Sequence, residues 1–348
     1  MQSDKQILVP ADELERRVLS ELTRAGASQD SAAAATRALM HASLIGVDSH
    51  GVRLTEHYCR MMAGGRINGT PRISVRRTAP ASVMLNGDDG LGHYAAYKAV
   101  ETGIEIARES GIAGVGVERS SHLGAAGAYA IAGAEQGFVT FATTNTDAMV
   151  TLFDGAQRFH GTNPLAFAAP VPDSRPWLLD MATSSIPMNR VLLHRSLGAE
   201  LPAGVAADAE GRVTRDPYQA EMLLPLGGQE YGYKGAGLAG VATLFSALLT
   251  GTTLDPDFIP MYGTDNDHEP RNMGHFIIVI DPRKFVGGEQ FGQAIGSYLN
   301  ALRGAPAREG GGPVMAPGDR EWAEAERRSV VGIPIDSDTA GFLKISPV

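Results

Sequence analysis

The sequence predicts a mixed α and β fold, in which a helical N-terminal segment precedes a sheet layered with helices. Three features support this prediction. Apolar residues recur at helical spacing through residues 10–62, strands and helices alternate between residues 82 and 143, and residues 276–280 form an apolar run closed by Asp281-Pro282. Alternating strands and helices are typical of a layered sheet, and the apolar run is typical of a strand at its centre.

The N-terminal segment divides into three helices. Asp12 can cap the first, whose apolar residues recur every fourth position along residues 14–22, and Ser28 can cap the second. Residues 52–62 continue the helical pattern until the glycine pair at positions 64 and 65. We therefore expect the first seventy residues to be entirely helical.

The rest of the chain alternates between the two periodicities, with glycine and proline at the junctions. A turn signal at residues 208–211 predicts a hairpin, and residues 238–248 predict a buried helix. The other expected elements are, in chain order, strands at 82–85, 112–117, 138–143, 165–169 and 177–181, and helices at 94–107, 125–136, 285–302 and from residue 319 onward.

Composition and charge restrict the class of protein. The chain has 348 residues, enough for one large or two medium domains, and a net charge of -9 without a basic stripe, so nucleic-acid binding is not expected. Cys59 is the only cysteine, which excludes an intrachain disulfide and fits the cytoplasm. The uncharged run at residues 235–254 is rich in glycine and threonine, so we interpret it as a buried helix and loop and expect no membrane span.

The first motif that can carry chemistry is DSHGVR at residues 48–53. A histidine beside an acid and an arginine can transfer protons near neutral pH, as His50 would here, and the Arg53 guanidinium can hold a carboxylate through two hydrogen bonds. His57 and Tyr58 follow closely and can line a substrate pocket. The alternative is structural, with Ser49 as a helix cap and the charged residues paired at the surface.

The second motif, SSHLG at residues 120–124, lies between a strand and a helix. His122 would stand at a helix N-terminus, where free N–H groups and the positive end of the dipole disfavour a charged imidazole. An ordinary helix start is the alternative. Small polar residues at 161–164 and 179–185 suit contacts with phosphate or the nicotinamide amide, although a simple turn explains them about equally well.

A glycine cluster around Lys234 is the last candidate. Lys234 stands where a helix is expected to open, and it can meet an anion there. The GAGLAG that follows matches GxGxxG, but the residues before it do not form the apolar strand that a Rossmann fingerprint requires. The sequence also lacks HExxH, paired cysteines and a GxSxG elbow, so no metal is expected and a metal-dependent hydrolase is a remote alternative.

Together these motifs make the sequence similar to the type 2 malate/L-lactate dehydrogenase family, which includes ureidoglycolate dehydrogenase, 2,3-diketogulonate reductase and sulfolactate dehydrogenase. The resemblance covers nearly the whole chain. The stretches that carry it are VDSHGVRL, SSHLGAAGAYA, TTNTDAMV, HGTNPLAFAAP, LLDMATSS, GYKGAGLAG, RNMGHFIIVID and MAPGDRE.

The resemblance implies an α+β, non-Rossmann fold that binds NAD or NADP. Residues 73–284 would form the cofactor- and substrate-binding domain, with a mixed or antiparallel sheet. Residues 1–72 would form a helical domain with the returning segment 285–348. A homodimer or higher homo-oligomer is also implied. The choice between NAD and NADP stays open, since Arg190 is either a partner for a 2′-phosphate or a surface arginine.

The resemblance also assigns roles to single residues. The candidates for proton donor or acceptor are His50 and His122, and those for substrate binding are Ser49, Arg53, His57 and Lys234. Many members place two residues between SHG and the arginine, whereas only Val52 intervenes here. The residues expected along the cofactor are His122, Asn145, Thr162, Asn163, Pro164, Asp180, Met181, Ala182, Thr183, Ser184, Lys234, Gly235, Pro317, Gly318 and Asp319.

The activity implied is hydride transfer between NAD(P) and a small 2-hydroxy acid, such as malate, lactate or ureidoglycolate, or its 2-oxo acid. Arg53 would bind the carboxylate while His50 or His122 moves the hydroxyl proton. One alternative is a reductase of a cyclic imine carboxylate, which would use the same site. The other is a non-catalytic ligand-binding relative, which the presence of both histidines, Arg53 and Lys234 argues against.

Overall fold

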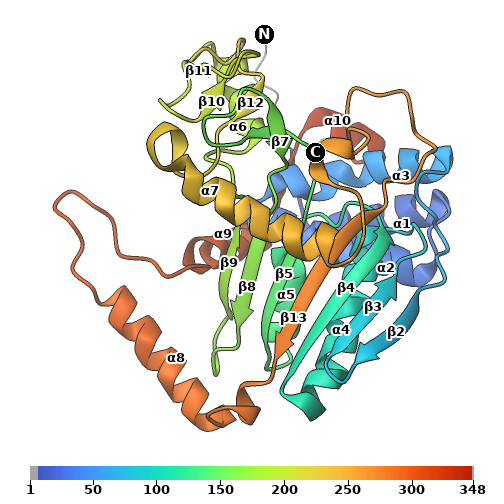
Figure 1. Cartoon of the computed structure of the whole chain (residues 1–348), viewed down its shortest axis with the longest axis vertical. Coiled ribbons are helices and arrows are strands. Elements are labelled where there is room, and N and C mark those ends of the chain that lie inside the picture. The colour runs from blue at the N-terminus through green and yellow to red at the C-terminus, as the bar shows by residue number, and fades with distance from the viewer. Residues whose placement is uncertain (1–6, 347–348) are drawn as a thin grey trace.

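The centre of the molecule is a seven-stranded sheet (Figure 1). A computed structural model describes residues 7–346 of the chain. The strand order is β2-β3-β4-β13-β5-β8-β9, and only the β3–β4 pair is parallel. In that order, the strands are β2 (Ser74–Ala79), β3 (Ser82–Asn86), β4 (Ile112–Ser120), β13 (Met273–Ile280), β5 (Val139–Thr144), β8 (Leu165–Ala169) and β9 (Trp177–Met181).

The alternation of strands and helices expected for residues 82–143 is present, but the sheet is mostly antiparallel. β4 and β5 do not pair with each other, because β13 arrives from far along the chain and lies between them, antiparallel to both. Ile277 and Val279 face one side of the sheet and Ile278 faces the other, as the pleat requires. The central strand predicted at residues 276–280 and the α+β class are therefore confirmed.

Helices cover both faces of this sheet (Figure 1). α4 (Gly92–Ser110) and α5 (Gly127–Ala134) pack on the face that carries Val279, where they bury the largest apolar core. α7 (Gly228–Thr243) and the π-helical turn that follows it pack on the opposite face. α4 ends at Gly111, whose φ of 82° is left-handed and favours glycine.

α7 differs from the buried helix predicted at residues 238–248. It begins at Gly228, so Lys234 lies in the middle of the helix and not at its start. Mainly small residues such as Ala239 and Ala242 are buried against the sheet. Of the four large apolar residues that suggested burial, Phe245 packs against the sheet, whereas the other three are partly exposed: Leu238 (36%), Val241 (40%) and Leu248 (60%). Among residues 7–346, no helix has the length and apolar character that a membrane crossing needs.

A second, five-stranded sheet lies beside the first. It contains the hairpin predicted at residues 208–211, in which β10 and β11 pair antiparallel and the Asp208 N–H donates to the Arg212 carbonyl at 2.9 Å. A small apolar core lies between this sheet and α6 (Met188–Leu197). The strands, in spatial order, are β11 (Val213–Thr214), β10 (Ala206–Ala207), β12 (Met222–Leu223), β6 (Val150–Thr151) and β7 (Arg158–His160).

The N-terminal helices share a core with the far end of the chain. Leu14, Val18 and Leu22 are fully buried among residues that include Ile333 and Leu343. The elements involved are β1 (Ile7–Val9), α1 (Ala11–Arg24), α2 (Gln29–Leu44), α3 (Thr55–Gly64), β14 (Ile333–Ile335) and α10 (Ser337–Phe342).

Two expectations for this N-terminal segment need correction. The segment is not entirely helical, because β1 pairs antiparallel with β14. Asp12 does not cap α1; the capping position is held by Pro10, which fixes the backbone without a side-chain hydrogen bond. Ser28 does cap α2, since its Oγ accepts the Ser31 N–H at 3.3 Å.

The segment after the sheet leaves the body of the molecule before it returns. α8 (Gly288–Arg303) extends away from the sheet, and a long loop leads back to α9 (Asp319–Val331) (Figure 1). Within α8 only Gly292 and Leu299 are buried. α9 packs on α2, and residues 333–345 complete the N-terminal core. Residues 285–348 therefore contain both an extended arm and a returning portion.

Candidate active site

Two of the predicted residues, His50 and His122, meet at one end of the main sheet. His50 ends a 3-10 turn at Asp48–His50, and His122 lies in the loop after β4. Their ring centroids are 5.7 Å apart. Ser49 lies beside them, with its Oγ 2.8 Å from His50 Nδ1. Burial lowers the pKa of His50, so the ring is neutral near pH 7.

The turn that carries His50 is fixed from two sides. The Ser43 hydroxyl accepts the Val52 N–H at 3.0 Å, and it lies so close to Gly51 that a Cβ there would collide with it. Arg328 of α9 reaches across and donates to Asp48, with Nη2 to Oδ2 at 3.0 Å. The returning C-terminal helix α9 therefore holds the turn that carries His50 in place.

Tyr58 of α3 completes the histidine pair. Its Oη lies 2.7 Å from His122 Nδ1, and the Gly124 N–H, which can only donate, points at the same nitrogen from 3.4 Å. Burial raises the pKa of Tyr58 well above its usual value, so the hydroxyl keeps its proton. Nδ1 is therefore an acceptor, and Nε2 carries the proton of the neutral imidazole.

The surroundings of His122 keep it uncharged. Burial, followed by the neighbouring His50 and His93, holds the pKa of His122 well below its usual value. His57 lies on the far side of Tyr58, with ring centroids 5.6 Å apart. Burial and the Arg60 charge lower the pKa of His57 to about 4. The site can therefore take a negatively charged substrate without first charging its own imidazoles.

The floor of the site is the end of the sheet at which the central strands β4 and β5 terminate and β13 begins. Met273 pairs with Ser120, and His275 pairs with Thr144. The His275 ring joins all three strands, with Nε2 2.9 Å from Ser120 Oγ and Nδ1 2.9 Å from Thr144 Oγ1. Burial lowers the pKa of His275 to about 3, so this crosslink is uncharged.

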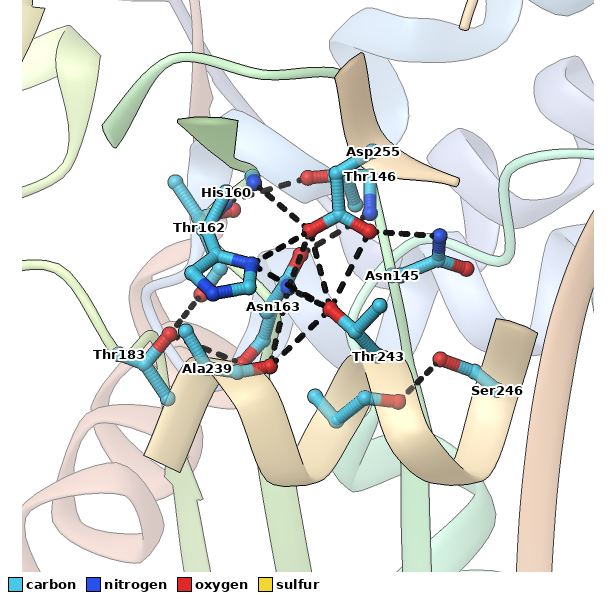
Figure 2. A network of polar contacts seen from close by, with 12 residues as sticks. Asn145, Thr146, His160, Thr162, Asn163, Thr183, Ala239, Thr243, Ser246 and Asp255 are labelled. Carbon is cyan, nitrogen blue, oxygen red and sulfur yellow. Dashed lines mark hydrogen bonds and ion pairs between the residues drawn. The ribbon is translucent and has the colours of Figure 1, made fainter. Parts of the chain in front are cut away.

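Asn145 and Asn163, both predicted along the cofactor, lie in a buried network around Asp255 (Figure 2). Asn145 Nδ2 donates to Asp255 at 2.8 Å and Asn163 Nδ2 at 2.7 Å, while His160 Nδ1 lies 3.0 Å away. Burial alone would raise the pKa of Asp255, but the hydrogen bonds from His160, Asn145 and Asn163 outweigh it and lower that pKa. The network joins the loops after β5 and β7 to α7.

One hydrogen-bond acceptor in the Asp255 network has no donor among the described residues. The Oδ1 atom of Asn145 is buried and has no hydrogen-bond partner among residues 7–346. Thr183 is fixed beside the network, because its hydroxyl donates to the Thr162 carbonyl at 3.0 Å and its N–H to the same carbonyl at 2.9 Å. The Pro164 carbonyl accepts the Thr143 hydroxyl at 2.8 Å.

The structure brings Asp180 together with Pro317 and Gly318. They line a cavity of about 330 Å³, to which Leu178, Leu179, Met315, Ala316, Arg320 and Glu321 also contribute. Asp180 Oδ2 accepts the Gly127 N–H at the start of α5 at 2.8 Å. Burial raises the pKa of Asp180 to about 6. Asp319 begins α9 and binds the Ala316 N–H and Arg303, which fixes the loop that forms one wall.

Met181, Ala182 and Ser184 continue from the same cavity toward the second sheet. Met181 is the last residue of β9, and both it and Ala182 are half-buried. Ser184 is buried and forms an isolated bridge with Pro225, and its hydroxyl donates to the Ile186 carbonyl at 2.9 Å. The DMATSS stretch thus connects the cavity at Asp180 with the base of α7.

Arg53 and Lys234 both lie at the surface of this chain. Arg53 is exposed and lines a separate cavity of about 230 Å³ with Asp48, Asp336 and Thr339, among others. Lys234 is exposed on α7, with Nζ 5.4 Å from the Tyr231 ring centroid. Gly235 packs directly on the backbone of Leu226, where a side chain would collide.

Known dehydrogenases are similar to this chain in sequence and in fold over nearly its whole length. Malate dehydrogenase from Pyrococcus abyssi is 34% identical over 335 residues, covering 94% of this chain and 91% of the relative. Ureidoglycolate dehydrogenase (NAD(+)) from Escherichia coli K12 is 32% identical, covering 96% and 94%. The crystal structure of malate dehydrogenase from Entamoeba histolytica superposes with a TM-score of 0.90 at 25% identity, covering 98% and 97%.

The fold and the relatives define an NAD(P)-dependent oxidoreductase of hydroxy acids, since proteins that match nearly the whole chain are dehydrogenases, and the names of some of them specify NAD(+) or NADP(+). The family model for malate/L-lactate dehydrogenase matches residues 9–344. The chain therefore belongs to the malate/L-lactate dehydrogenase family, as its motifs indicated.

Two features of the site were not assigned from the sequence. Tyr58 was expected to line a substrate pocket, but its contact with His122 was not predicted, because it joins residues 64 positions apart. The Gly127 N–H on Asp180 was not expected at all, although GAAGAY carries a small residue where close approach is needed. Both contacts depend on long-range packing that local periodicity does not reveal.

Proposed function

We propose that this protein interconverts a small 2-hydroxy acid, of the malate, lactate or ureidoglycolate type, and its 2-oxo acid. The observation that carries the proposal is the half-buried pair His50 and His122, with the buried Tyr58 beside it, at one end of the main sheet. The bound nicotinamide supplies or accepts the hydride, and the protein provides orientation and electrostatics.

In this proposal, one of the two histidines transfers the proton of the substrate hydroxyl. His122 has Nε2–H available, so it can donate a hydrogen bond to the substrate oxygen and polarise the carbonyl in the direction of reduction. His50 is the other candidate, because its Nδ1 is occupied by Ser49 and its Nε2 remains for the substrate. The low polarity around both rings strengthens such hydrogen bonds.

The residues along the predicted cofactor site fit a dinucleotide. The cavity at Asp180, Pro317 and Gly318 has room and a carboxyl acceptor suited to ribose hydroxyls. The orphaned Asn145 Oδ1 suits an amide donor. In this proposal Asp180 to Ser184, Asn145 and residues 317–319 hold the cofactor. Lys234, Gly235 and the GTNP turn at 161–164 support the same region.

A cyclic imine carboxylate is the second candidate substrate. The structure of Δ1-piperideine-2-carboxylate reductase from Pseudomonas syringae superposes with a TM-score of 0.85 at 28% identity. The same site would accept such a substrate, because a C=N bond and a carboxylate replace the C=O bond and carboxylate of a 2-oxo acid. Direct competition between the two acids distinguishes these candidates.

We also propose that the protein is a cytoplasmic homodimer. The exposed apolar residues of α7 and the π-helical turn, together with the projecting α8, form surfaces that a second copy would cover. Gly237 and Gly240 of α7 support this proposal. Each costs about 1 kcal/mol in helix stability. A Cβ added at either position would meet nothing within 4 Å among residues 7–346 outside the helix's own backbone, so this chain alone gives no reason for glycine there, whereas a closely packed partner would.

The absorbance of the reduced nicotinamide tests the reaction. NADH or NADPH is mixed with the protein and a panel of 2-oxo acids and cyclic imine acids, and the reverse reaction is followed with malate, lactate and ureidoglycolate. We expect one cofactor to be oxidised with one class of acid. Absence of turnover together with absence of cofactor binding by fluorescence would overturn the proposal and favour the non-catalytic alternative.

A further inference from the structure

Arg271 and Asp147 lie at the same sheet edge as His122. Ser120 ends β4 two residues before His122, and it pairs with Met273, which begins β13 two residues after Arg271. Thr144 ends the neighbouring β5 three residues before Asp147. The three side chains therefore extend beyond the ends of three adjacent strands, β4, β13 and β5.

Arg271 is a buried guanidinium with an unused donor. Its side chain is only 5% exposed. Nη2 donates to Asp147 at 2.5 Å, and the guanidinium carbon lies 5.0 Å from the Phe258 ring centroid. Nε has no partner among residues 7–346. A buried charged donor without an acceptor is costly, and this guanidinium lies beyond the strand ends beside His122, where a ligand can supply the acceptor.

The charge of Arg271 reaches the site. It is one of the groups, after burial, His50 and His93, that lower the pKa of His122. It acts in the same direction on His57. Asp147 is itself fixed, because its Oδ2 accepts the Met261 N–H at 3.1 Å. The guanidinium is thus held rigidly, between an aromatic ring and a carboxylate, close to the imidazole that faces the substrate oxygen.

Arg53, by contrast, is directed toward solvent. It is exposed and shares its cavity with Asp48 and Asp336. The next residue, Leu54, is buried, so no second cation enters the site from this turn. An anion beside Arg53 would meet the carboxylate of Asp336 and that of Asp48, which Arg328 pairs. An anion beside Arg271 meets a buried guanidinium that Asp147 partly neutralises, together with two uncharged imidazoles.

We infer that the guanidinium of Arg271, held by Asp147, binds the carboxylate of the 2-oxo or 2-hydroxy acid, and that Arg53 does not. This inference rests on the proposed function. The carboxylate lies on the β13 side of the site, and the C2 oxygen lies toward His122. Asp147 is a positioning residue, because it acts on the substrate only through the guanidinium.

Oxamate and oxamide provide the test, since they differ in charge and hardly in shape. Their binding to the protein–NADH or protein–NADPH complex is measured by fluorescence for the wild type, Arg271→Lys, Arg271→Met, Arg53→Met and Arg66→Lys. Arg66 is the matched control, because it is also buried and also has an unpartnered Nε. The readout is the ratio of the two dissociation constants, which does not depend on the folded fraction of each variant.

We expect the wild type to favour oxamate by about 10²-fold, as charge-assisted hydrogen bonds predict. Arg271→Met should bring the ratio close to one, and Arg271→Lys should lower it about 10-fold, because lysine keeps the charge and loses the planar donor. Arg66→Lys should keep the wild-type ratio. The inference is overturned if Arg271→Met and Arg271→Lys both keep the wild-type ratio, or if Arg53→Met removes it.

Failure of this inference and failure of the proposed function give different results. If the wild type reduces an acid and only Arg53→Met loses the preference for oxamate, the function stands and the assignment to Arg271 falls. If the wild type shows no preference for oxamate and turns over no acid, the proposed function falls as well.

Discussion

At the scale of single residues, the chemistry of the site depends on two imidazoles kept neutral by burial. General acid–base help of this kind contributes about 10²–10⁴-fold to turnover. We therefore expect either His122→Ala or His50→Ala to lower kcat by that factor while the cofactor dissociation constant stays within about twofold. Steady-state kinetics with the acid identified by the absorbance panel measures both. Near-normal turnover in both variants would show that neither histidine transfers the proton.

Tyr58 orients His122 through one hydrogen bond, and its removal tests that role. Tyr58→Phe keeps the ring and its packing and removes only the hydroxyl that faces Nδ1. A net hydrogen bond of about 1 kcal/mol corresponds to several-fold in rate, so kcat should fall about 10-fold or less, with KM little changed. Tyr97→Phe, on α4 away from the site, is the control. An unchanged kcat in Tyr58→Phe would contradict the orienting role.

At the scale of elements, the start of α5 is coupled to Asp180 through Gly127. A Cβ at position 127 would lie 2.6 Å from Asp180 Oδ2, so Gly127→Ala should displace the carboxyl from the cavity. We expect cofactor affinity to fall about 10-fold, the value of one hydrogen bond to a charged group. Fluorescence titration measures it. Gly296→Ala, at a helical glycine with open space around it, should leave the affinity unchanged.

The two glycines on the exposed side of α7 give opposite predictions for a monomer and a dimer. In a monomer, Gly237→Ala with Gly240→Ala would stabilise the helix by about 1–2 kcal/mol, because the added Cβ atoms would meet nothing within 4 Å outside the helix's own backbone. If a second copy packs closely there, the same change separates the protomers. We expect light scattering to show a dimer for the wild type and a larger monomer fraction for the double variant. A variant that stays dimeric and melts higher would exclude this face as the interface.

Sequence periodicity predicted the elements better than their arrangement. The strand at 276–280 was predicted because it is short, apolar and closed by proline, and α2 was predicted because Ser28 caps it. The prediction for α7 was wrong for a physical reason. Leucine and valine at helical spacing indicate an apolar face, but they do not indicate what covers it, and in this chain that face is partly exposed. Sequence periodicity also did not predict the antiparallel strand order, because β13 pairs with strands more than 120 residues earlier in the chain.

The candidate site could be predicted in part. His50, His122, Asp180 and the 317–319 turn came from motifs, and the structure brings Asp180 and Pro317 to one cavity although they are far apart in sequence. Arg53 was singled out by its neighbours in the chain, and only the fold shows that it faces solvent. Arg271 was overlooked because its significance lies in a missing hydrogen bond, which no sequence pattern records.

At the scale of the whole molecule, buried neutral histidines make stability depend on pH. Burial lowers the pKa of His41 and His57 to about 4 and that of His93 and His275 to about 3. The unfolded chain binds these protons near pH 6.5, so stability is fully present above that pH and is lost as the pH falls. Each such histidine lowers the free energy of unfolding by about 2 kcal/mol when the pH falls from 7 to 5.

Asp180 opposes this trend, because burial raises its pKa to about 6 and the folded state then gains a proton in the same range. This protonation of Asp180 in the folded state offsets about 1 kcal/mol of the loss in the free energy of unfolding. We therefore expect the free energy of unfolding in urea to fall by several kcal/mol from pH 7 to pH 5. His93→Gln and His275→Gln should each flatten the dependence. A stability that is constant across this range would show that these rings are protonated in the folded state.

The pairing of β1 with β14 has a consequence for synthesis on the ribosome. The core around Leu14, Val18 and Leu22 is closed by Ile333, Ile335 and Leu343, which are made more than 300 residues later. At ordinary translation rates the interval is roughly 15–60 s. During that time the first helices emerge with their apolar faces open while the central sheet is still being assembled. The earliest part of the chain to be translated is therefore among the last to reach its native packing, and it is the part that a holding chaperone would need to cover.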